Sequence, residues 1–194
     1  MLLKEVGLQL YSLREETEKD FCATVEKVAK MGYTGVEFAG YGGLKPAALA
    51  QLLKDNGLAA YGTHFGALPK TDAELDAQIE MNLALGNPYL VCPWHDMKTR
   101  DDALRLAEIM NETAAKLKPH GLRLGYHNHA HEFAKDGDDT LMDVLMENTE
   151  KEIFAEFDVF WVAYAGYDPV EYIRKYAGRQ PLMHLKELAA EGHE

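Results

Sequence analysis

Residues 101–132 read DDALRLAEIMNETAAKLKPHGLRLGYHNHAHE, and the order of features in this stretch indicates the fold. Residues 101–118 have the spacing of an amphipathic helix, and Pro119 and Gly121 follow as stop signals. Residues 122–127 then have the composition of a short buried strand, which runs directly into histidines and an acid. A helix followed by a strand with a polar end is typical of one βα unit of a parallel α/β sheet.

The same alternation of short apolar runs and longer amphipathic runs extends along the chain. The predicted strands are residues 6–11, 35–38, 58–63, 89–92, 122–127, 153–157 and 182–185. The predicted helices are residues 20–31, 46–56, 73–85, 101–118, 140–148 and 169–176. This pattern fits an α/β (β/α)8 TIM barrel better than a doubly wound sheet. We therefore expect a single barrel domain over residues 1–194, truncated after the seventh strand, with strand eight missing.

Composition and charge exclude several classes of protein. The 194 residues suit one domain with its own core. The net charge of −12 repels phosphate backbones, so nucleic acid is not an expected partner. Lys4 and Glu5 interrupt the first apolar run, and no stretch is long enough to span a bilayer, so neither a signal peptide nor a membrane is expected. Cys22 and Cys92 belong to no motif, which favours reduced thiols and a cytoplasmic location.

Polar groups gather where the predicted strands end, which is where (β/α)8 barrels form their sites. Glu132, Asp158 and His184 are spaced 26 residues apart in each interval, about one βα unit, so they are expected at equivalent heights on consecutive strands. Two carboxylates and an imidazole are a ligand set for one divalent metal ion, Mn²⁺, Mg²⁺ or Co²⁺, with Zn²⁺ as an alternative.

Each of these residues also has a simpler explanation when it is considered alone. His184 can be a hydrogen-bonded core histidine, Glu132 a solvated or helix-capping acid, and Asp158 a turn or N-cap residue. The HNHAHE run can be a cluster of surface histidines. The metal hypothesis therefore depends on the three residues as a set at predicted strand ends.

Several segments resemble the sugar phosphate isomerase/epimerase family, the xylose isomerase-like TIM barrels. They are GLQLYSLR, MGYTGVEFAGYGG, YHNHAHEF, EFDVFWVAYAGYDPVEYIRKYAGR and MHLKE, in this order from the first predicted strand to the seventh. The resemblance implies that Glu132, Asp158 and His184 bind one metal ion. It also implies a fourth ligand, a Glu on strand eight, which has no counterpart in this sequence.

The activity that the resemblance implies is isomerisation or epimerisation of a small sugar or sugar phosphate. A proton would move between adjacent carbons through an enediolate, with Glu132 as the catalytic acid or base. Lys186 lies two residues after His184 and so shares its face of an extended strand. The expected substrate-binding residues are His64, His95, His127, His129, Trp161 and Lys186, although each histidine can equally make a structural hydrogen bond, Lys186 can be a surface lysine and Trp161 can pack in a core.

Alternative functions remain open at this point. An inosose-type dehydratase of the same superfamily would use the same metal and a related enolate. An endonuclease acting at abasic sites would need a basic DNA groove, which the negative charge argues against. A truncated barrel that binds sugar without turnover is the non-enzyme alternative. Its open strand edges would favour a homo-oligomer.

Overall fold

The computed structural model describes residues 5–187, which fall into two compact units. The first unit contains the chain up to Leu90 together with His120–Leu122, and the second contains Val91–Pro119 and the chain from Arg123 onward. Strand β4 (Tyr89–Cys92) and the short 3-10 helix η2 (Lys118–His120) each cross the division between them. Each unit is described by itself.

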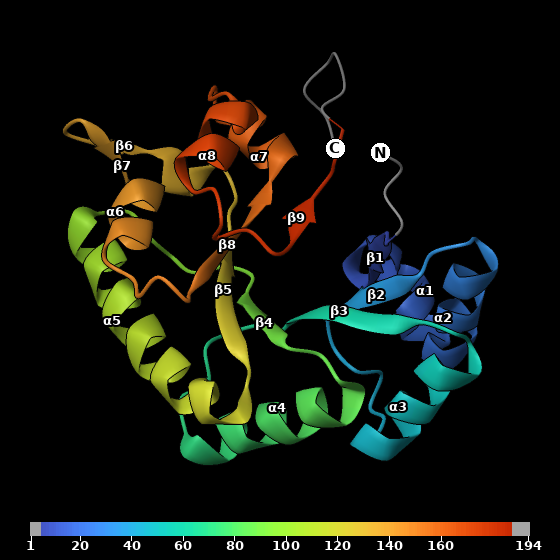
Figure 1. Ribbon diagram of the computed structural model, residues 1–194. Helices are drawn as coiled ribbons and strands as arrows, with labels where there is room; N and C mark the ends of the chain where they lie inside the picture. The colour runs from blue at the N-terminus through green and yellow to red at the C-terminus, as the bar shows by residue number, and fades with distance from the viewer. Residues whose placement is uncertain (1–4, 188–194) are drawn as a thin grey trace. The chain divides into compact units, whose positions relative to one another are not determined.

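The first unit contains three parallel strands with helices packed on them (Figure 1). The strands, in sheet order, are β1 (Gly7–Gln9), β2 (Gly35–Phe38) and β3 (Ala59–His64). The helices are η1 (Leu10–Leu13), α1 (Arg14–Lys19), α2 (Phe21–Lys30), α3 (Pro46–Asp55) and α4 (Asp72–Leu85). Their apolar faces form one core, in which Val36 and Phe38 of β2 meet Val25 of α2 and Leu49 of α3.

Local sequence signals explain where the helices of the first unit begin and end. Asp20 caps α2, because its carboxylate accepts a hydrogen bond of 2.9 Å from the Ala23 N–H. Thr71 and Glu74 form a reciprocal capping box at the start of α4. Gly86 ends α4 with a positive φ of 64°, a backbone conformation that glycine adopts without steric cost.

The second unit also contains parallel strands, in the order β5 (Arg123–His127), β8 (Phe154–Asp158) and β9 (Met183–His184). Its helices are α5 (Arg100–Leu117), η3 (His131–Phe133), α6 (Leu141–Glu147), α7 (Val159–Tyr164) and α8 (Pro169–Lys175). A short hairpin of β6 (Lys135–Asp136) and β7 (Asp139–Thr140) precedes α6, and α5 packs along α6 (Figure 1).

The register of these strands brings polar residues together at their carboxyl ends. His127 of β5 is the partner of Glu156 on β8, and Asp158 of β8 is the partner of His184 on β9. All five residues of β8 are buried. Because side chains alternate along a strand, Glu156 and Asp158 share one face of the sheet, while Phe157 points to the other and packs on Tyr172.

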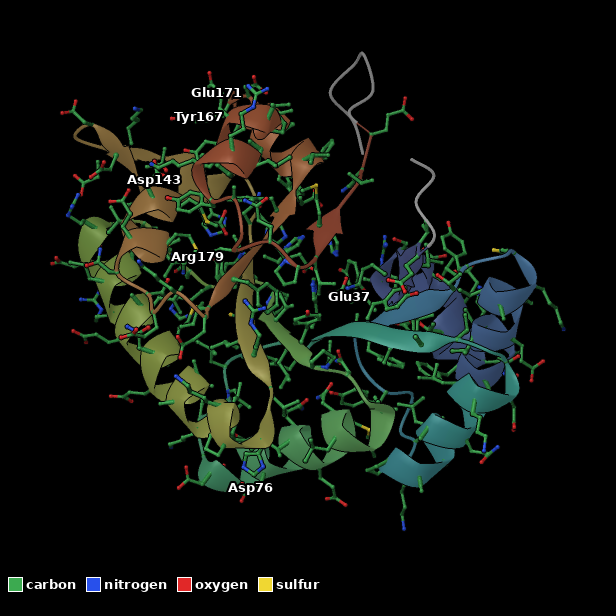
Figure 2. The ribbon with its side chains drawn as sticks, in the orientation of Figure 1. Glu37, Asp76, Asp143, Tyr167, Glu171 and Arg179 are labelled. Atoms are coloured by element: carbon green, nitrogen blue, oxygen red, sulfur yellow. The ribbon has the colours of Figure 1, made fainter. Side chains whose placement is uncertain are left out.

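Two side chains, Arg179 and Asp143, join α6 and the loop after it to the segment that follows α8 (Figure 2). Arg179 donates hydrogen bonds to the Met146, Glu150 and Ile153 carbonyls and to the Thr149 hydroxyl, and so holds the loop between α6 and β8. Asp143 on α6 is buried and accepts a hydrogen bond of 2.7 Å from the Tyr176 hydroxyl.

The α/β fold class and the alternation of strands and helices are confirmed. All seven predicted strands and all six predicted helices are present, most of them within one or two residues of the expected bounds. The first strand is shorter than expected, because the chain enters η1 at Leu10. Helices α1 and α7 and the β6–β7 hairpin were not predicted, since each is too short to show a periodic pattern. Within residues 5–187, no helix combines the length and the apolar character that crossing a bilayer requires.

Candidate functional site

Three side chains in the second unit converge at the ends of three adjacent parallel strands. They are His127 at the end of β5, Asp158 at the end of β8 and His184 at the end of β9. Asp158 Oδ2 lies 3.6 Å from His127 Nε2 and 3.8 Å from His184 Nδ1. One ligand atom from each residue lies within 4.8 Å of the other two. The side chains are 7%, 5% and 17% exposed for His127, Asp158 and His184, so the group is largely shielded from bulk water.

Asp158 uses its two carboxylate oxygens for different purposes. Oδ1 caps α7, because it accepts hydrogen bonds of 2.9 Å from the Phe160 N–H and 3.3 Å from the Trp161 N–H. Oδ2 faces the two imidazoles. Burial raises the pKa of Asp158, but the neighbouring imidazoles of His127 and His184 lower it by more, so the pKa lies well below its usual range. The N-cap role considered for this residue and a ligand role are therefore compatible in one side chain.

The orientation of His127 is set by a backbone carbonyl. Its Nδ1 lies 3.4 Å from the Pro93 oxygen. Because a carbonyl only accepts hydrogen bonds, this contact favours the tautomer with the proton on Nδ1. The lone pair of Nε2 is then directed toward Asp158. His127 was predicted to bind substrate, and the structure groups it with Asp158 and His184.

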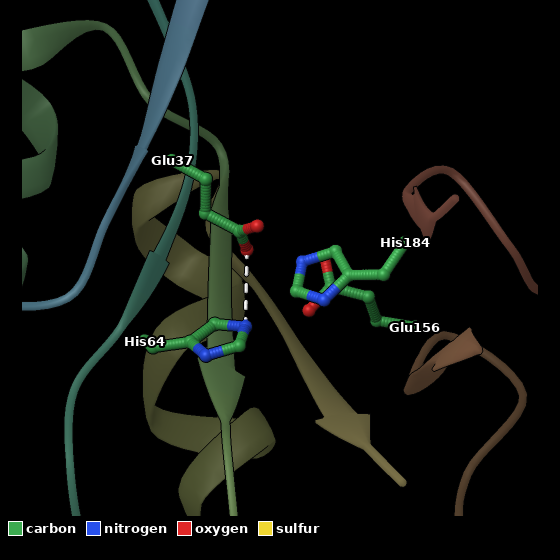
Figure 3. Close-up of side chains that lie close together, drawn as sticks. All are labelled: Glu37, His64, Glu156 and His184. Carbon is green, nitrogen blue, oxygen red and sulfur yellow. Dashed lines mark ion pairs between the residues drawn. The ribbon is translucent and has the colours of Figure 1, made fainter. Parts of the chain in front are cut away.

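His184 lies between two carboxylates. Its Nδ1 faces Asp158, and its Nε2 lies 3.6 Å from Oε1 of Glu156, which Figure 3 shows beside the imidazole ring. Glu156 was not singled out from the sequence. The signal was present, since Glu156 precedes Asp158 by two residues on a predicted strand and must therefore share its face.

Glu132 lies in a separate hydrogen-bonded group. Its Oε1 accepts a bond of 2.8 Å from the Tyr126 hydroxyl, and its Oε2 accepts one of 2.9 Å from the His129 N–H. His131 Nε2 lies 3.4 Å from Oε1. Burial raises the pKa of Glu132, and the neighbouring His131 and the hydrogen bonds offset part of this rise. The structure thus brings Asp158 and His184 together as predicted, while Glu132 is not among the grouped ligand atoms of residues 5–187.

Aromatic and cationic side chains lie next to the three-residue group. The His129 ring lies 5.0 Å from the His127 ring and 5.3 Å from the Trp161 ring, centroid to centroid. The Lys186 ammonium lies over Phe160 and Trp161, at 4.3 and 5.0 Å from their centroids. Three of the predicted substrate-binding residues, His129, Trp161 and Lys186, are therefore neighbours in the second unit.

The other two predicted substrate-binding histidines lie elsewhere. His95 is half-buried in the second unit, and its backbone carbonyl accepts a hydrogen bond of 2.9 Å from His131 Nε2. His64 belongs to the first unit, at the end of β3. Its Nε2 lies 3.2 Å from Oε1 of Glu37 on β2, as the dashed line in Figure 3 marks. His64 was predicted from the sequence to bind substrate, and its ion pair with Glu37 was not predicted.

The donor set of His127, Asp158 and His184 fits a divalent metal ion. Two imidazole nitrogens and one carboxylate oxygen are ligands for Mn²⁺, Fe²⁺, Co²⁺ and Zn²⁺. Ligand atoms about 2.1 Å from a tetrahedral ion lie about 3.4 Å apart. The 3.6 and 3.8 Å separations need only a small closure to reach that arrangement. Three protein ligands with open positions are typical of catalytic rather than structural sites.

Comparison with known proteins identifies relatives. The family model for the xylose isomerase-like TIM barrel matches residues 25–192. The crystal structure of a sugar phosphate isomerase/epimerase from Parabacteroides distasonis is similar, with a TM-score of 0.81 and 28% identity over 99% of this chain and 82% of that one. A second such structure from the same organism has a TM-score of 0.80 and 26% identity, over 97% of this chain and 77% of that one.

Among curated proteins, an inosose dehydratase of Clostridium perfringens is 34% identical over 88 residues. This match covers 44% of the present chain and 29% of the dehydratase, so it spans less than a third of that relative's length.

Proposed function

The chain belongs to the xylose isomerase-like TIM barrel family, and from this premise we propose that it acts in a divalent-metal-dependent isomerase or epimerase of a small sugar or sugar phosphate. The observation that carries the proposal is the group of His127, Asp158 and His184 at the carboxyl ends of three adjacent parallel strands. (β/α)8 barrels form their active sites at this end of the strands, and two imidazoles with a carboxylate are a ligand set for divalent metal ions.

The three grouped residues would hold one metal ion. When bound, the ion would supply Lewis-acid polarisation of a substrate carbonyl and a template for an adjacent hydroxyl. Asp158 brings the negative charge, and its bonds to the N–H groups of α7 fix the direction of its carboxylate. The Pro93 carbonyl fixes the ring of His127. These restraints keep the donor atoms in place before substrate arrives, which is what preorganised sites require.

Glu132 is the proposed acid–base residue. The reaction removes a proton from the carbon next to a carbonyl, and the electron pair moves toward the carbonyl oxygen to give an enediolate. A carboxyl group with a raised pKa is suited to accept and return this proton near neutral pH. Hydrogen bonds from Tyr126 and from the His129 N–H hold the carboxylate in position.

The substrate would be held by the residues next to the metal ligands. Trp161 offers an aromatic face to the apolar side of a sugar ring, and the Lys186 ammonium beside it would bind a substrate oxygen or a phosphate as a point charge. His129, which contacts Trp161, would donate to or accept from a sugar hydroxyl. His95 and His64 remain proposed substrate contacts, and a cytoplasmic location and homo-oligomer formation remain expectations.

The proposal is tested in two steps with the same protein. First, Co²⁺ binding is measured by titration for the native chain and for a His127→Ala, Asp158→Ala, His184→Ala variant, with His120→Ala, an exposed histidine, as the matched control. We expect binding that the triple variant loses and the control retains. Second, ketoses with and without phosphate are incubated with the Co²⁺-loaded chain in D₂O, and deuterium incorporation next to the carbonyl is followed by NMR.

Three results are distinguishable. Metal binding with deuterium incorporation supports the proposed function. Metal binding without deuterium incorporation into any of the ketoses contradicts the proposed catalysis and favours the non-catalytic barrel. Absence of Co²⁺ binding in the native chain contradicts the metal site.

A second candidate is dehydration of an inosose-like cyclic polyol ketone. The similarity to inosose dehydratases over part of the chain favours it. The same first proton transfer would be followed by loss of a neighbouring hydroxyl as water, which gives a conjugated enone. Ultraviolet absorbance of the enone separates dehydration from isomerisation, because an isomerase or epimerase product has no such chromophore.

A further inference from the structure

Glu156 is a buried carboxylate that the roles proposed above leave unassigned. It lies in the middle of β8, and its side chain is 1% exposed. Its Oε1 lies 3.6 Å from His184 Nε2. Burying a carboxylate is unfavourable unless the group is paired. Here the Glu156 carboxylate faces Nε2 of His184, one of the three proposed metal ligands.

The position of Glu156 bears on the tautomer of His184. A neutral imidazole has one N–H and one lone pair, and a carboxylate can only accept a hydrogen bond. A metal ion bound by both Asp158 and His184 needs a lone pair on Nδ1 of His184, because this is the nitrogen that faces Asp158. The proton must then be on Nε2, which is the nitrogen that faces Glu156.

His127 shows the same arrangement with a different acceptor. Its Nδ1 faces the Pro93 carbonyl, and its Nε2 faces Asp158. Each of the two imidazoles thus has one nitrogen toward Asp158 and the other toward a group that accepts hydrogen bonds. The strand register explains this pairing, because His127 is aligned with Glu156 and His184 with Asp158.

We propose that Glu156 is a positioning residue that holds the proton of His184 on Nε2 and so directs the Nδ1 lone pair to the metal ion. This inference rests on the proposed function, because it assigns a role within the same metal site. Imidazole ligands generally donate their second N–H to a carboxylate or a carbonyl, and loss of that acceptor weakens metal binding.

The test compares three variants with the native chain. Glu156→Met removes the acceptor with little change in volume. Glu156→Gln retains an amide oxygen that can accept from Nε2–H. Glu152→Gln neutralises a half-exposed carboxylate just before β8 and is the matched control. The Co²⁺ dissociation constant is expected to rise about 10- to 100-fold for Glu156→Met, less for Glu156→Gln, and not for Glu152→Gln.

A second measurement does not need the metal. Long-range ¹H–¹⁵N correlation spectra of the metal-free chain give the tautomer of His184, with the signal assigned by its loss in His184→Ala. We expect the Nε2–H form in the native chain and in Glu152→Gln, and a larger share of the Nδ1–H form in Glu156→Met. An unchanged tautomer in Glu156→Met would overturn the inference, whether or not the native chain binds Co²⁺. Failure of Co²⁺ binding in the native chain would instead contradict the proposed function.

Discussion

Asp158 illustrates how one side chain can serve both folding and a site. Its Oδ1 satisfies N–H groups at the start of α7, and its Oδ2 faces two imidazoles. Sequence patterns could place this residue at a strand end, but an N-cap and a metal ligand have the same signature there. The two roles are separable by substitution, because an amide can still cap a helix while it is a much poorer ligand for a cation.

Replacement of Asp158 by Asn should abolish Co²⁺ binding and lower the free energy of unfolding by less than replacement by Ala does. Asn is as good an N-cap as Asp, so the bonds to α7 can persist. Replacement by Ala should abolish binding and also lower the free energy of unfolding by a further 1 kcal/mol or so. Urea unfolding of the metal-free variants measures this difference. Equal stability of the two variants would show that the cap contributes nothing measurable.

Glu132 poses a different question at the same scale. The sequence assigned it both as a ligand and as the acid–base residue, and the structure places it with Tyr126 and His129. The HNHAHE run has four candidate ligand residues within six positions, and spacing alone cannot decide which of them shares the face of Asp158. The decision is made by where β5 ends, at His127, and by the turn of η3 that follows.

Replacement of Glu132 by Gln separates its two assigned roles. We expect Co²⁺ affinity to stay within about threefold of the native value, because Glu132 lies outside the grouped ligand atoms. The rate of deuterium incorporation into a ketose substrate should fall about 10²–10⁴-fold, because this is the usual contribution of an acid–base residue. A large loss of Co²⁺ affinity would instead favour the ligand role that the sequence suggested.

At the scale of elements, the repeated alternation of strands and helices made the fold predictable, whereas the shortest elements could not be predicted. Apolar strands such as 35–38 and 89–92 were placed at their observed bounds, because glycine and proline signals limit them closely. Helix α7 begins immediately after β8, so no turn signal separates it from the strand. The hydrogen bonds that join α6 and the loop after it to the segment after α8 could not be predicted either, since they connect residues about thirty positions apart.

Replacement of Arg179 by Lys should lower the free energy of unfolding by about 2–3 kcal/mol. The guanidinium donates to three carbonyls and one hydroxyl at once, and an ammonium on a flexible chain cannot reproduce that planar geometry. Arg174→Lys, at an exposed position of α8, is the matched control and should change stability by less than about 0.5 kcal/mol. Similar urea midpoints for both variants would show that the carbonyls find other donors.

At the scale of the molecule, the proposed metal ligands all belong to the second unit, and so do both tryptophans, Trp94 and Trp161. Tryptophan fluorescence therefore reports the unfolding of the unit that would hold the ion. A ligand that binds only the folded state stabilises it by about 2.7 kcal/mol at a free concentration of 100 times its dissociation constant. For a chain of this size, that corresponds to a rise of about 5–10 °C in the midpoint of thermal unfolding.

We expect this rise when Co²⁺ is added to the native chain, and its reversal when a chelator removes the ion. The Asp158→Asn variant should show neither effect when its midpoints with and without Co²⁺ are compared. A comparable rise in Asp158→Asn would mean that Co²⁺ binds elsewhere, to surface carboxylates of this strongly acidic chain, and not through the three grouped residues. Fluorescence-monitored melting of both chains at several Co²⁺ concentrations distinguishes these outcomes, because binding through Asp158 gives a midpoint that rises with free metal in the native chain and not in the variant.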